Sequence, residues 1–395
     1  MRNADLVARG LKSVWHPCTQ MKDHEGTLPL VPIKRGEGVW LEDFESNRYI
    51  DAVSSWWVNL FGHANPRINA AIQEQIGQLE HVILAGFTHE PVVYHGETLG
   101  ALALGDVALY KDTYQPLLME VMTAPSPDAF NKEPGETDEE YALRQFEAMD
   151  ALLAEKHDEI CAVVVEPLIQ CAGGMRMHHP IYHTKLREAC DKYGVHLIAD
   201  EIAVGFGRTG TLFACEQSGI TPDFMCLSKG LTAGYLPLSV VLTTDTVYNA
   251  FYDDYETLKA FLHSHSYTGN PIGCAVALAT LDIFRDDNVI ENNKRLSTCM
   301  ADSVAHLADH PNVGDIRQHG MTLAVEMVKN KATKEPFPWQ ERRGIRVYQH
   351  ALTRQSLLRP LGNVVYFMPP YVITEEQIRH LAQVATEGIE IAVRD

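Results

Sequence analysis

The sequence predicts an α/β fold in two parts: a large domain built on a central, mostly parallel sheet, and a small α+β domain. Three observations predict it. Short apolar runs alternate with helical segments between about residues 66 and 275, as in a wound α/β domain. Two of these runs end in a charged residue, Asp200 in one and Lys229 in the other. After about residue 288 the alternation stops and a different pattern of helices and strands begins.

The chain is expected to divide at two positions. Residues 1–65 contain a hairpin with strands at 38–44 and 48–52, separated by turn-forming residues. Residues 66–285 form the large domain, and residues 286–395 form the C-terminal part of the small domain. We expect the first and last segments to build one small domain from two distant pieces of chain.

Within the large domain the predicted elements alternate. Residues 124–139, rich in Pro, Asp and Glu, predict a surface loop, and a helix follows to about residue 156. Residues 161–166 predict a buried strand. A helix at 182–193 leads into the strand that ends at Asp200. Residues 270–285 predict a helix whose small residues permit close packing.

The C-terminal segment predicts, in order, a helix, a strand, a helix, a hairpin and a final helix. Thr374 and Gln377 have the spacing of a capping box, which marks the first turn of that last helix. With 395 residues, 46% of them hydrophobic, the chain can bury a large core.

Composition argues against several classes of function. A formal net charge of −19 without a basic stripe argues against nucleic-acid binding. No secretory leader and no bilayer-length apolar run is present, so we expect a cytoplasmic protein without membrane contact. The eight cysteines include no Cys-x-x-Cys pair, which indicates reduced thiols. The histidines at 178–183 and 263–265 lack carboxylates at ligand spacing, so no metal is expected.

Asp200 and Lys229 carry the chemistry that this fold predicts. Ligands of open α/β sheets gather at the carboxyl ends of the strands, and these two residues end successive apolar runs. Pyridoxal 5′-phosphate requires both groups. A lysine forms an imine with it, and a carboxylate keeps its pyridine nitrogen protonated so that the ring accepts electrons. The pair therefore predicts a pyridoxal phosphate site.

Three other interpretations compete with this one. A lysine at a strand end is most often a solvated surface charge. An apolar run ending in Asp-Glu is also typical of P-loop ATPases, but the sequence lacks their phosphate-binding loop. Residues 205–210 match the dinucleotide fingerprint Gly-x-Gly-x-x-Gly. That fingerprint directly follows a strand, and the next strand ends in an acid. Here the preceding strand stops at Asp200 and the next ends in Lys229, so we reject it.

Together these residues resemble the class III, or ω-type, aminotransferases. The general strings are Val-Glu-Pro at 165–167, Asp-Glu-Ile at 200–202 with the glycine-rich turn after it, and Ser-Lys-Gly at 228–230. The resemblance runs from Trp15 to near the C-terminus. It implies the fold of the fold-type I pyridoxal phosphate transferases, whose large domain holds a mostly parallel sheet of seven-stranded type.

A narrower resemblance concerns the substrates. Strings at 15–21, 54–57, 173–177 and 359–371 are similar to those of members that pass the amino group of S-adenosylmethionine to 8-amino-7-oxononanoate in biotin biosynthesis. Two alternatives stay open. One is an ω-aminotransferase that acts on a diamine, an ornithine derivative or a β-amino acid. The other is a catalytically silent scaffold or binding protein.

Within one subunit, the resemblance assigns five residues to the cofactor. It gives Lys229 the covalent link and the proton shuttle, and Asp200 the contact with the pyridine nitrogen. Ile202 and Tyr94 would enclose the two faces of the ring, because an aliphatic and an aromatic side chain together exclude water, and Tyr94 would also border the substrate. Glu166, from the Val-Glu-Pro string, is also placed beside the cofactor.

The segment 264–266 corresponds in the family to one that crosses a dimer interface. His265 and Ser266 would reach the cofactor phosphate of the partner subunit, and Ser264 would contact the substrate. The resemblance therefore implies a homodimer with shared active sites.

For the substrate, the resemblance implies a pocket lined by Trp56. It gives Arg359 the far carboxylate, a bidentate contact that suits Arg better than Lys, and places Arg208 near a substrate carboxylate. On sequence alone, Trp56 and Trp57 could equally be core aromatics, and Arg359 an ordinary surface ion pair. Cys18 stands where some relatives have a substrate-binding tyrosine, and cysteine cannot supply that phenol.

One family segment has no counterpart here. Relatives carry an additional strand and helix between the positions of residues 94 and 95, and a turn in that segment cups the cofactor phosphate with backbone amides. Either the sequence as given omits this segment, or the protein lacks it. We favour omission, because a true deletion would remove a strand from the central sheet and uncover apolar surface. A true deletion would favour the silent scaffold.

Overall fold

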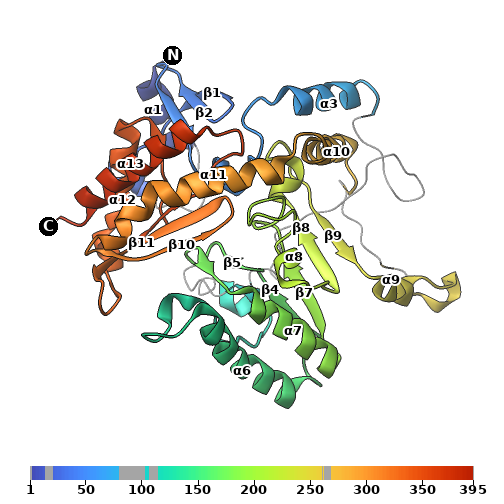
Figure 1. Ribbon diagram of the computed structural model, residues 1–395. Coiled ribbons are helices and arrows are strands. Elements are labelled where there is room, and N and C mark those ends of the chain that lie inside the picture. Colours follow the sequence, from blue (N-terminus) through green and yellow to red (C-terminus); the bar gives the residue numbers. More distant parts are fainter. Residues whose placement is uncertain are drawn as a thin grey trace. The chain divides into compact units, whose positions relative to one another are not determined.

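The chain forms two compact units (Figure 1). The terminal unit joins Met1–Pro66 to Glu291–Asp395, and the central unit is Arg67–Ile290. The computed structural model describes residues 2–13, 21–79, 103–105, 114–259, 261 and 268–394. None of the helices within these ranges has the length and apolarity required to cross a bilayer.

A sheet lies at the centre of the central unit. Its described strands are, in spatial order, β4 (Ala162–Val165), β7 (His196–Asp200), β8 (Phe224–Leu227) and β9 (Val240–Thr243). The first three are parallel, and β9 runs antiparallel to β8. This arrangement confirms the predicted α/β class, and the short apolar runs are strands as expected.

Two helices, α6 (Asp138–Lys156) and α7 (Pro180–Tyr193), pack against each other beside β4 and β7 (Figure 1). The acidic loop ends where Thr137 and Glu140 form a capping box that starts α6. α7 ends at Gly194, whose φ of 70° favours glycine. The side chains buried between the helices and β7 are Ala142, Tyr182, Leu186, Cys190 and Leu197.

A second helix pair of the central unit is α3 (Pro66–Ile76) and α10 (Pro271–Asp286). Arg67 joins them through ion pairs of 2.7 Å to Asp286 and 3.2 Å to Asp287. The shorter elements of this unit are η2 (Gln115–Leu117), η3 (Ala129–Asn131), β5 (Ile169–Gln170), β6 (Arg176–Met177), α8 (Cys215–Ser218), η4 (Lys229–Thr232), α9 (Asp245–Phe251) and η5 (Tyr255–Thr257).

The terminal unit contains two sheets. One has the order β1 (Ile33–Glu37), β2 (Trp40–Asp43), β3 (Arg48–Asp51) and β13 (Ser356–Leu357). β2 and β3 form the predicted hairpin, and β13 pairs parallel with β3, so distant pieces of chain share this sheet. The other sheet contains β10 (Val313–His319), β11 (Thr322–Asn330), β12 (Glu335–Pro336) and β14 (Val364–Phe367).

The predicted order of elements in the C-terminal segment was wrong. The hairpin comes before α12 (Arg343–Thr353), where β10 and β11 pair in antiparallel register. The two strands after α12, expected to form the hairpin, belong to different sheets. β13 is parallel to β3, and β14 is antiparallel to β11. Their partners are far away in sequence, so the local pattern contains no signal for the pairing.

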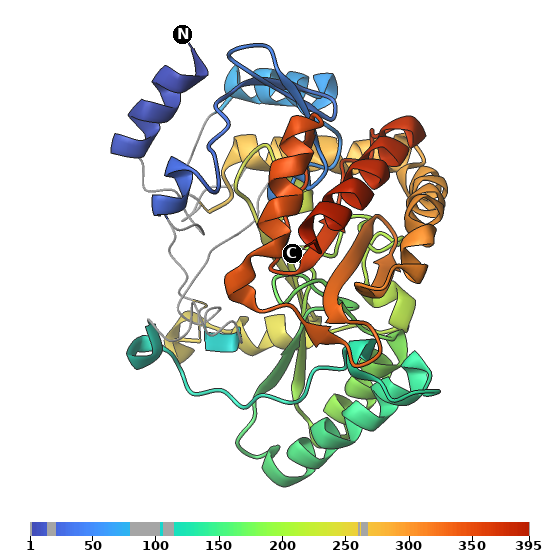
Figure 2. The same ribbon diagram turned by 90° about the vertical axis from the view of Figure 1, so that its left-hand side faces the viewer.

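The helices of the terminal unit are mostly long and amphipathic. α12 packs along α13 (Glu375–Ala392), as Figure 2 shows in orange-red and red. α13 begins with the predicted capping box of Thr374 and Gln377. The remaining elements of this unit are α1 (Asn3–Ser13), η1 (Met21–Glu25), α2 (Ser54–Trp57), α11 (Val289–Val304), η6 (Ala305–Asp309) and η7 (Trp339–Glu341).

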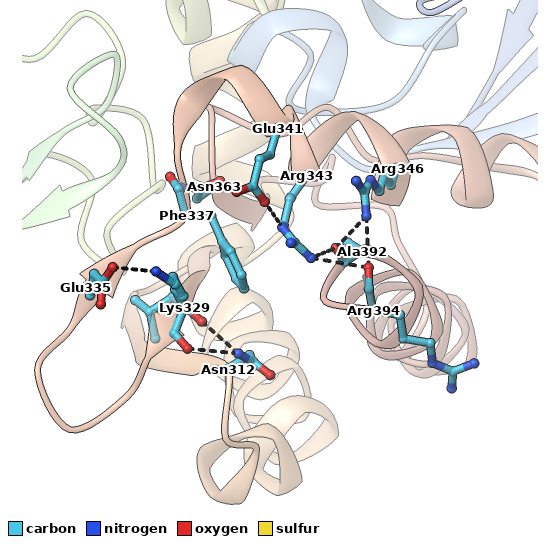
Figure 3. A network of polar contacts seen from close by, with 11 residues as sticks. Asn312, Lys329, Glu335, Phe337, Glu341, Arg343, Arg346, Asn363, Ala392 and Arg394 are labelled. Atoms are coloured by element: carbon cyan, nitrogen blue, oxygen red, sulfur yellow. Dashed lines mark hydrogen bonds and ion pairs between the residues drawn. The ribbon is translucent and has the colours of Figure 1, made fainter.

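Two arginines hold the C-terminal end of α13 (Figure 3). Arg343 donates a hydrogen bond of 2.8 Å to the carbonyl of Ala392, and its guanidinium lies 4.1 Å from the centre of the Phe337 ring. Arg346 donates one of 3.0 Å to the carbonyl of Arg394. The last carbonyls of a helix have no partner within it, so these cations stabilise that end.

Candidate active site

The parallel register brings the ends of three strands to one edge of the central sheet. Asp200, the last residue of β7, pairs with Cys226 of β8, and Val165 at the end of β4 pairs with Ala199. Glu166 therefore follows β4 next to Asp200, and Lys229 opens the η4 turn just beyond β8. The structure brings the predicted acid and lysine to the same edge.

The buried thiol of Cys171 lies near the charged groups of this edge, because four of them affect its pKa. Burial raises the pKa of Cys171, and the negative charges of Glu166 and Asp200 raise it further. The positive charges of Lys229 and Arg208 act in the opposite direction. All four charged groups thus lie within electrostatic reach of one sulfur atom, and sequence reasoning gave this cysteine no role.

Glu166 is poised to exchange a proton near neutral pH. Its Oε2 accepts a hydrogen bond of 3.1 Å from the Cys171 amide. Burial raises the pKa of Glu166 to about 7, with a further contribution from Asp200, against the opposing effects of that amide and Lys229. Two carboxyl groups side by side resist being ionised together. The site thus holds one acid whose raised pKa favours its protonated form beside an ionised neighbour.

Lys229 has a strained backbone. Its φ of 41° lies in the left-handed region, which non-glycine residues rarely occupy and which is found often at functional sites. The neighbouring chain secures it, because the Ser228 hydroxyl donates to the carbonyl of Leu238 at 2.9 Å and the Leu231 amide donates to that of Ser228 at 2.9 Å. These hydrogen bonds hold the strained backbone of Lys229 in place at the strand edge.

The carboxylates of Asp200 and Glu201 hold the chain after β7 by accepting hydrogen bonds from backbone amides. The Ile202 amide donates to Asp200 Oδ1 at 3.0 Å, which orients that carboxylate. Glu201 is completely buried, and its two oxygens accept from the amides of Ala214 and Cys215, each at 2.7 Å. Burial raises the pKa of Glu201 and the two amides oppose it. Sequence reasoning missed this role, although an acid directly after a buried strand is an unusual feature that could have suggested it.

The glycine-rich stretch that follows is not a dinucleotide loop. Residues 202–213 form successive turns, and the next helix, α8, begins only at Cys215. A Cβ on Gly205 would lie 2.9 Å from the Glu201 carbonyl oxygen, so glycine is required there for close approach. Arg208, expected near a substrate carboxylate, lies in this stretch with a side chain that is 1% exposed. The structure supports rejecting the dinucleotide reading.

Trp56 and Arg359 meet in the terminal unit. The Arg359 guanidinium lies 4.3 Å from the centre of the Trp56 ring, a cation–π contact. Arg359 also acts on Tyr348 of α12, where burial raises the pKa of the phenol and the guanidinium lowers it. Trp56 is 43% exposed, whereas Trp57 is buried and donates from Nε1 to the Tyr366 hydroxyl at 3.0 Å. The core interpretation therefore holds for Trp57 and fails for Trp56.

The α2 turn that carries both tryptophans is left-handed. The φ angles are 49° at Ser54, 46° at Ser55, 75° at Trp56 and 72° at Trp57, and its amides still bond to carbonyls four residues back, as Trp57 does to Val53 at 2.8 Å. For residues with a Cβ this conformation costs roughly 1–2 kcal/mol each. Strain of this size persists only where surrounding contacts impose it.

The remaining predicted site residues lie outside the described residues. They are Cys18, Tyr94, Ser264, His265 and Ser266.

A groove of about 790 Å³ lies elsewhere in the terminal unit, between α11 and α13. Its charged side chains pair with each other: Glu375 accepts from Arg379 at 2.7 Å and also from Arg295. Since acids and bases alternate along it, the groove presents no charge of one sign to a ligand. We assign it no catalytic role.

An acid and a lysine at the carboxyl ends of neighbouring parallel strands fit a pyridoxal-phosphate-dependent transaminase of fold type I, and the comparisons with known proteins show that class. The sequence profile of the class-III aminotransferases matches residues 21–93 and 92–387, so the chain belongs to that family. The family model therefore matches well over half of the chain.

Relatives agree along nearly the whole chain. The adenosylmethionine-8-amino-7-oxononanoate aminotransferase of Helicobacter pylori is 42% identical, over 95% of each chain. The enzyme of the same name from Geobacter sulfurreducens is 38% identical, over 97% of this chain and 96% of the relative. The crystal structure of that enzyme from Methanocaldococcus jannaschii matches with a TM-score of 0.90 at 33% identity, covering 98% of this chain and 99% of the other.

A more distant structure is the ω-transaminase of Pseudomonas jessenii in complex with PMP. It matches with a TM-score of 0.90 at 25% identity, covering 98% of each chain. The architecture is thus shared with transaminases whose names specify other amines or none.

The alignments contain a break. The two matched pieces of the family profile meet at residues 92–93, close to the predicted position between residues 94 and 95. The alignment with the Helicobacter pylori relative spans 433 positions, more than the 395 residues of this chain. The relative therefore has residues to which nothing in this chain corresponds.

Proposed function

We propose that this protein transfers the amino group of S-adenosylmethionine to 8-amino-7-oxononanoate, forming 7,8-diaminononanoate for biotin biosynthesis. The observation that carries the chemistry is the register of β7 and β8, which brings Asp200 and Lys229 to one sheet edge. The substrates are inferred from relatives that bear this name and match along the whole chain.

The residues at this edge fit pyridoxal 5′-phosphate. Asp200 keeps one carboxylate oxygen oriented by the Ile202 amide, as a partner of a protonated ring nitrogen must be. Lys229 is the amine within electrostatic reach of the same cluster. When bound, the cofactor supplies an electron sink that stabilises negative charge on the substrate carbon. Asp200, Lys229, Ile202 and Glu166 are the described residues that would hold it.

Lys229 has the proton-transfer role in this proposal. Its Nζ removes the proton from the amine-bearing carbon of the donor and later delivers one to the same position of the acceptor. The left-handed backbone at Lys229 fixes the origin of the side chain, so the amine reaches both substrates from the same side. Glu166, with a pKa raised to about 7 mainly by burial, exchanges a proton next to Asp200 and limits the net charge of the site.

Trp56 and Arg359 serve the far end of the acceptor. The exposed face of Trp56 offers an apolar surface for a straight aliphatic chain. Arg359, close to that ring, offers the fork of donors that a terminal carboxylate accepts in bidentate fashion. A long chain with a carboxylate at its end matches the two groups together. We also propose that the terminal and central units are the small and large domains of the family.

We further propose that the active form is a cytoplasmic homodimer. Large apolar side chains are exposed together along α9 and the segment after it, with Tyr252 at 73% and Leu258 at 78%. Tyr248 stacks on Tyr252 with ring centres 5.5 Å apart. Exposed apolar surface of this kind marks interaction sites, and a second copy of the chain is the partner that the family resemblance implies. Light scattering of the purified protein measures the assembly.

A second candidate function is an ω-aminotransferase that acts on a diamine, an ornithine derivative or a β-amino acid, supported by the structural match to ω-transaminases. A product assay separates the two. The purified protein, supplied with pyridoxal 5′-phosphate and 8-amino-7-oxononanoate, is offered S-adenosylmethionine, lysine, ornithine or β-alanine, and 7,8-diaminononanoate is measured by mass spectrometry.

We expect product with S-adenosylmethionine. Product with another donor alone would favour the second candidate. Absence of product with every donor would contradict the proposal. The intact mass of the protein shows in the same preparation whether residues are present beyond the 395 given.

A further inference from the structure

Asp51 anchors the left-handed α2 turn from one side. This carboxylate is completely buried at the end of β3. Its Oδ1 accepts from the Ser55 amide at 2.9 Å, and its Oδ2 accepts from the Ser55 hydroxyl at 2.6 Å. Both hydrogen bonds hold Ser55, the residue directly before Trp56. The carboxylate can therefore impose the unfavourable backbone angles of Ser55.

His63 holds Asp51 in turn. Its Nε2 lies 3.1 Å from Asp51 Oδ2, and its Nδ1 lies 3.0 Å from the Asn59 amide nitrogen. These contacts fit a neutral ring that donates from Nε2 and accepts at Nδ1. The backbone of His63 exchanges two hydrogen bonds with Gly38, of 2.7 and 3.0 Å. A Cβ on Gly36 would stand 2.7 Å from His63 Cγ, so the strand packs directly against the ring.

The other side of the turn is also fixed. The Ser54 hydroxyl donates to the carbonyl of Met368 at 2.6 Å, and Trp57 donates to the Tyr366 hydroxyl. Three of the four residues in α2 are therefore tied to the surrounding unit. Trp56 is the member whose ring is 43% exposed, and it lies against Arg359. The contacts of its three neighbours therefore hold the backbone from which the exposed Trp56 ring extends.

We propose that Asp51 and His63 are positioning residues for Trp56: the carboxylate, fixed by the imidazole, holds the Ser55 backbone and hydroxyl and thereby sets the direction of the indole in the substrate site. The inference rests on the proposed function in one respect, the contact of Trp56 with substrate. Without the carboxylate, the turn relaxes from its left-handed form and the indole leaves its position beside Arg359.

A double-mutant cycle tests this. We expect Asp51→Asn to keep the shape of the side chain while it loses an acceptor, and to lower kcat/KM for 8-amino-7-oxononanoate roughly 10- to 100-fold, mainly through KM. In a Trp56→Ala background the same change should have almost no further effect, because the ring it positions is gone. Additive losses would show a general structural role and overturn the proposal.

The matched control is Asp43→Asn. Asp43 is also a buried carboxylate of the β2–β3 hairpin, but it stands at the opposite end and accepts from Asn47 and Glu45 amides at 2.9 Å each. It should lower stability without changing KM. Should Asp51→Asn fail to fold, Ser55→Ala removes one contact, and Gly36→Ala displaces the His63 ring. Both should raise KM in the same direction, and an unchanged KM in both would contradict the proposal.

The fluorine NMR signal of Trp56 tests this inference without an activity assay and so separates it from the proposed function. In protein labelled with 5-fluorotryptophan, the Trp56 resonance is assigned by its loss in Trp56→Phe. Asp51→Asn should shift or broaden that resonance and leave the one from Trp339, at an exposed position in η7, unchanged. An unshifted Trp56 signal overturns the positioning role. An inactive wild-type protein with a shifted signal would overturn the function alone.

Discussion

The strand edge of the central unit and the α2 turn of the terminal unit use buried carboxylates in opposite ways. At the edge, the charges of Asp200 and Lys229 both act on Glu166, and burial raises the pKa of Glu166 to about 7. At the turn, Asp51 accepts two hydrogen bonds from Ser55 and one from His63. In the proposed function the first arrangement moves protons, and in the proposed inference the second fixes the direction of a substrate-binding side chain. The same residue type would thus serve the reaction in one unit and recognition in the other.

Among substitutions that leave Lys229 in place, the largest effect should come from Asp200→Asn. The amide keeps the bond from Ile202 but carries no charge to balance a protonated ring nitrogen, so kcat should fall roughly 100- to 1000-fold. Steady-state kinetics with saturating cofactor measures it. The control is Asp223→Asn, a carboxylate beside the other end of β7 that accepts from Leu197 and Arg187 at 2.7 Å. A similar loss of kcat in both would mean that the edge has no special role.

Arg359 should separate recognition from chemistry. Arg359→Lys keeps the charge but loses the fork of donors, so KM for 8-amino-7-oxononanoate should rise roughly tenfold, equivalent to about 1.4 kcal/mol, with kcat nearly unchanged. Arg359→Leu should have a larger effect. An acceptor analogue without the far carboxylate should bind the wild type and both variants equally. A fall in kcat with unchanged KM would place Arg359 with the chemistry instead.

Glu166 should make stability depend on pH. A carboxyl whose pKa is raised by folding binds its proton more tightly in the folded state, so its contribution weakens as the pH rises from about 4.5 to about 7. Glu166→Gln removes the charge that burial opposes. The variant should therefore gain more in Tm relative to wild type at pH 8 than at pH 5. Calorimetry of Glu166→Gln beside Glu188→Gln, at an exposed position of α7, measures this, and equal gains at both pH values would contradict it.

Substitutions at the end of α13 should change stability, because two arginines bond to the last carbonyls there. Arg343→Ala removes a hydrogen bond to the Ala392 carbonyl and the contact with the Phe337 ring, and should cost about 2 kcal/mol of unfolding free energy. Arg346→Ala, at a more exposed side chain bonded to the same helix end, should cost less than half as much. Urea titration measures both, and equal losses would mean that burial does not matter here.

The elements that were predictable are those with local signals. The apolar runs ending at Asp200 and near Lys229 identified two parallel strands, and parallel strands must present their carboxyl ends at one edge. The capping boxes of α6 and α13 were readable because the interacting residues are three positions apart. The acid and the lysine at that edge predicted the cofactor, and the family resemblance added the substrates, which the strand pattern alone does not contain.

What escaped prediction depends on distant contacts. β13 and β14 are short, and their partners, β3 and β11, lie far away in sequence. The left-handed α2 turn contains no glycine, so its string gave no hint of positive φ angles. The roles of Cys171 and Glu201 arise from burial beside residues that fold next to them. Such features follow from tertiary packing and have no pattern of their own.

Borohydride reduction tests most directly whether Lys229 is the residue that binds the cofactor covalently. The purified protein is mixed with pyridoxal 5′-phosphate, reduced, digested and mapped by mass spectrometry. A single stable pyridoxyl adduct is expected on Lys229, and none in Lys229→Ala, with turnover lost in that variant. An adduct on a different lysine, or turnover that survives the substitution, would contradict the account.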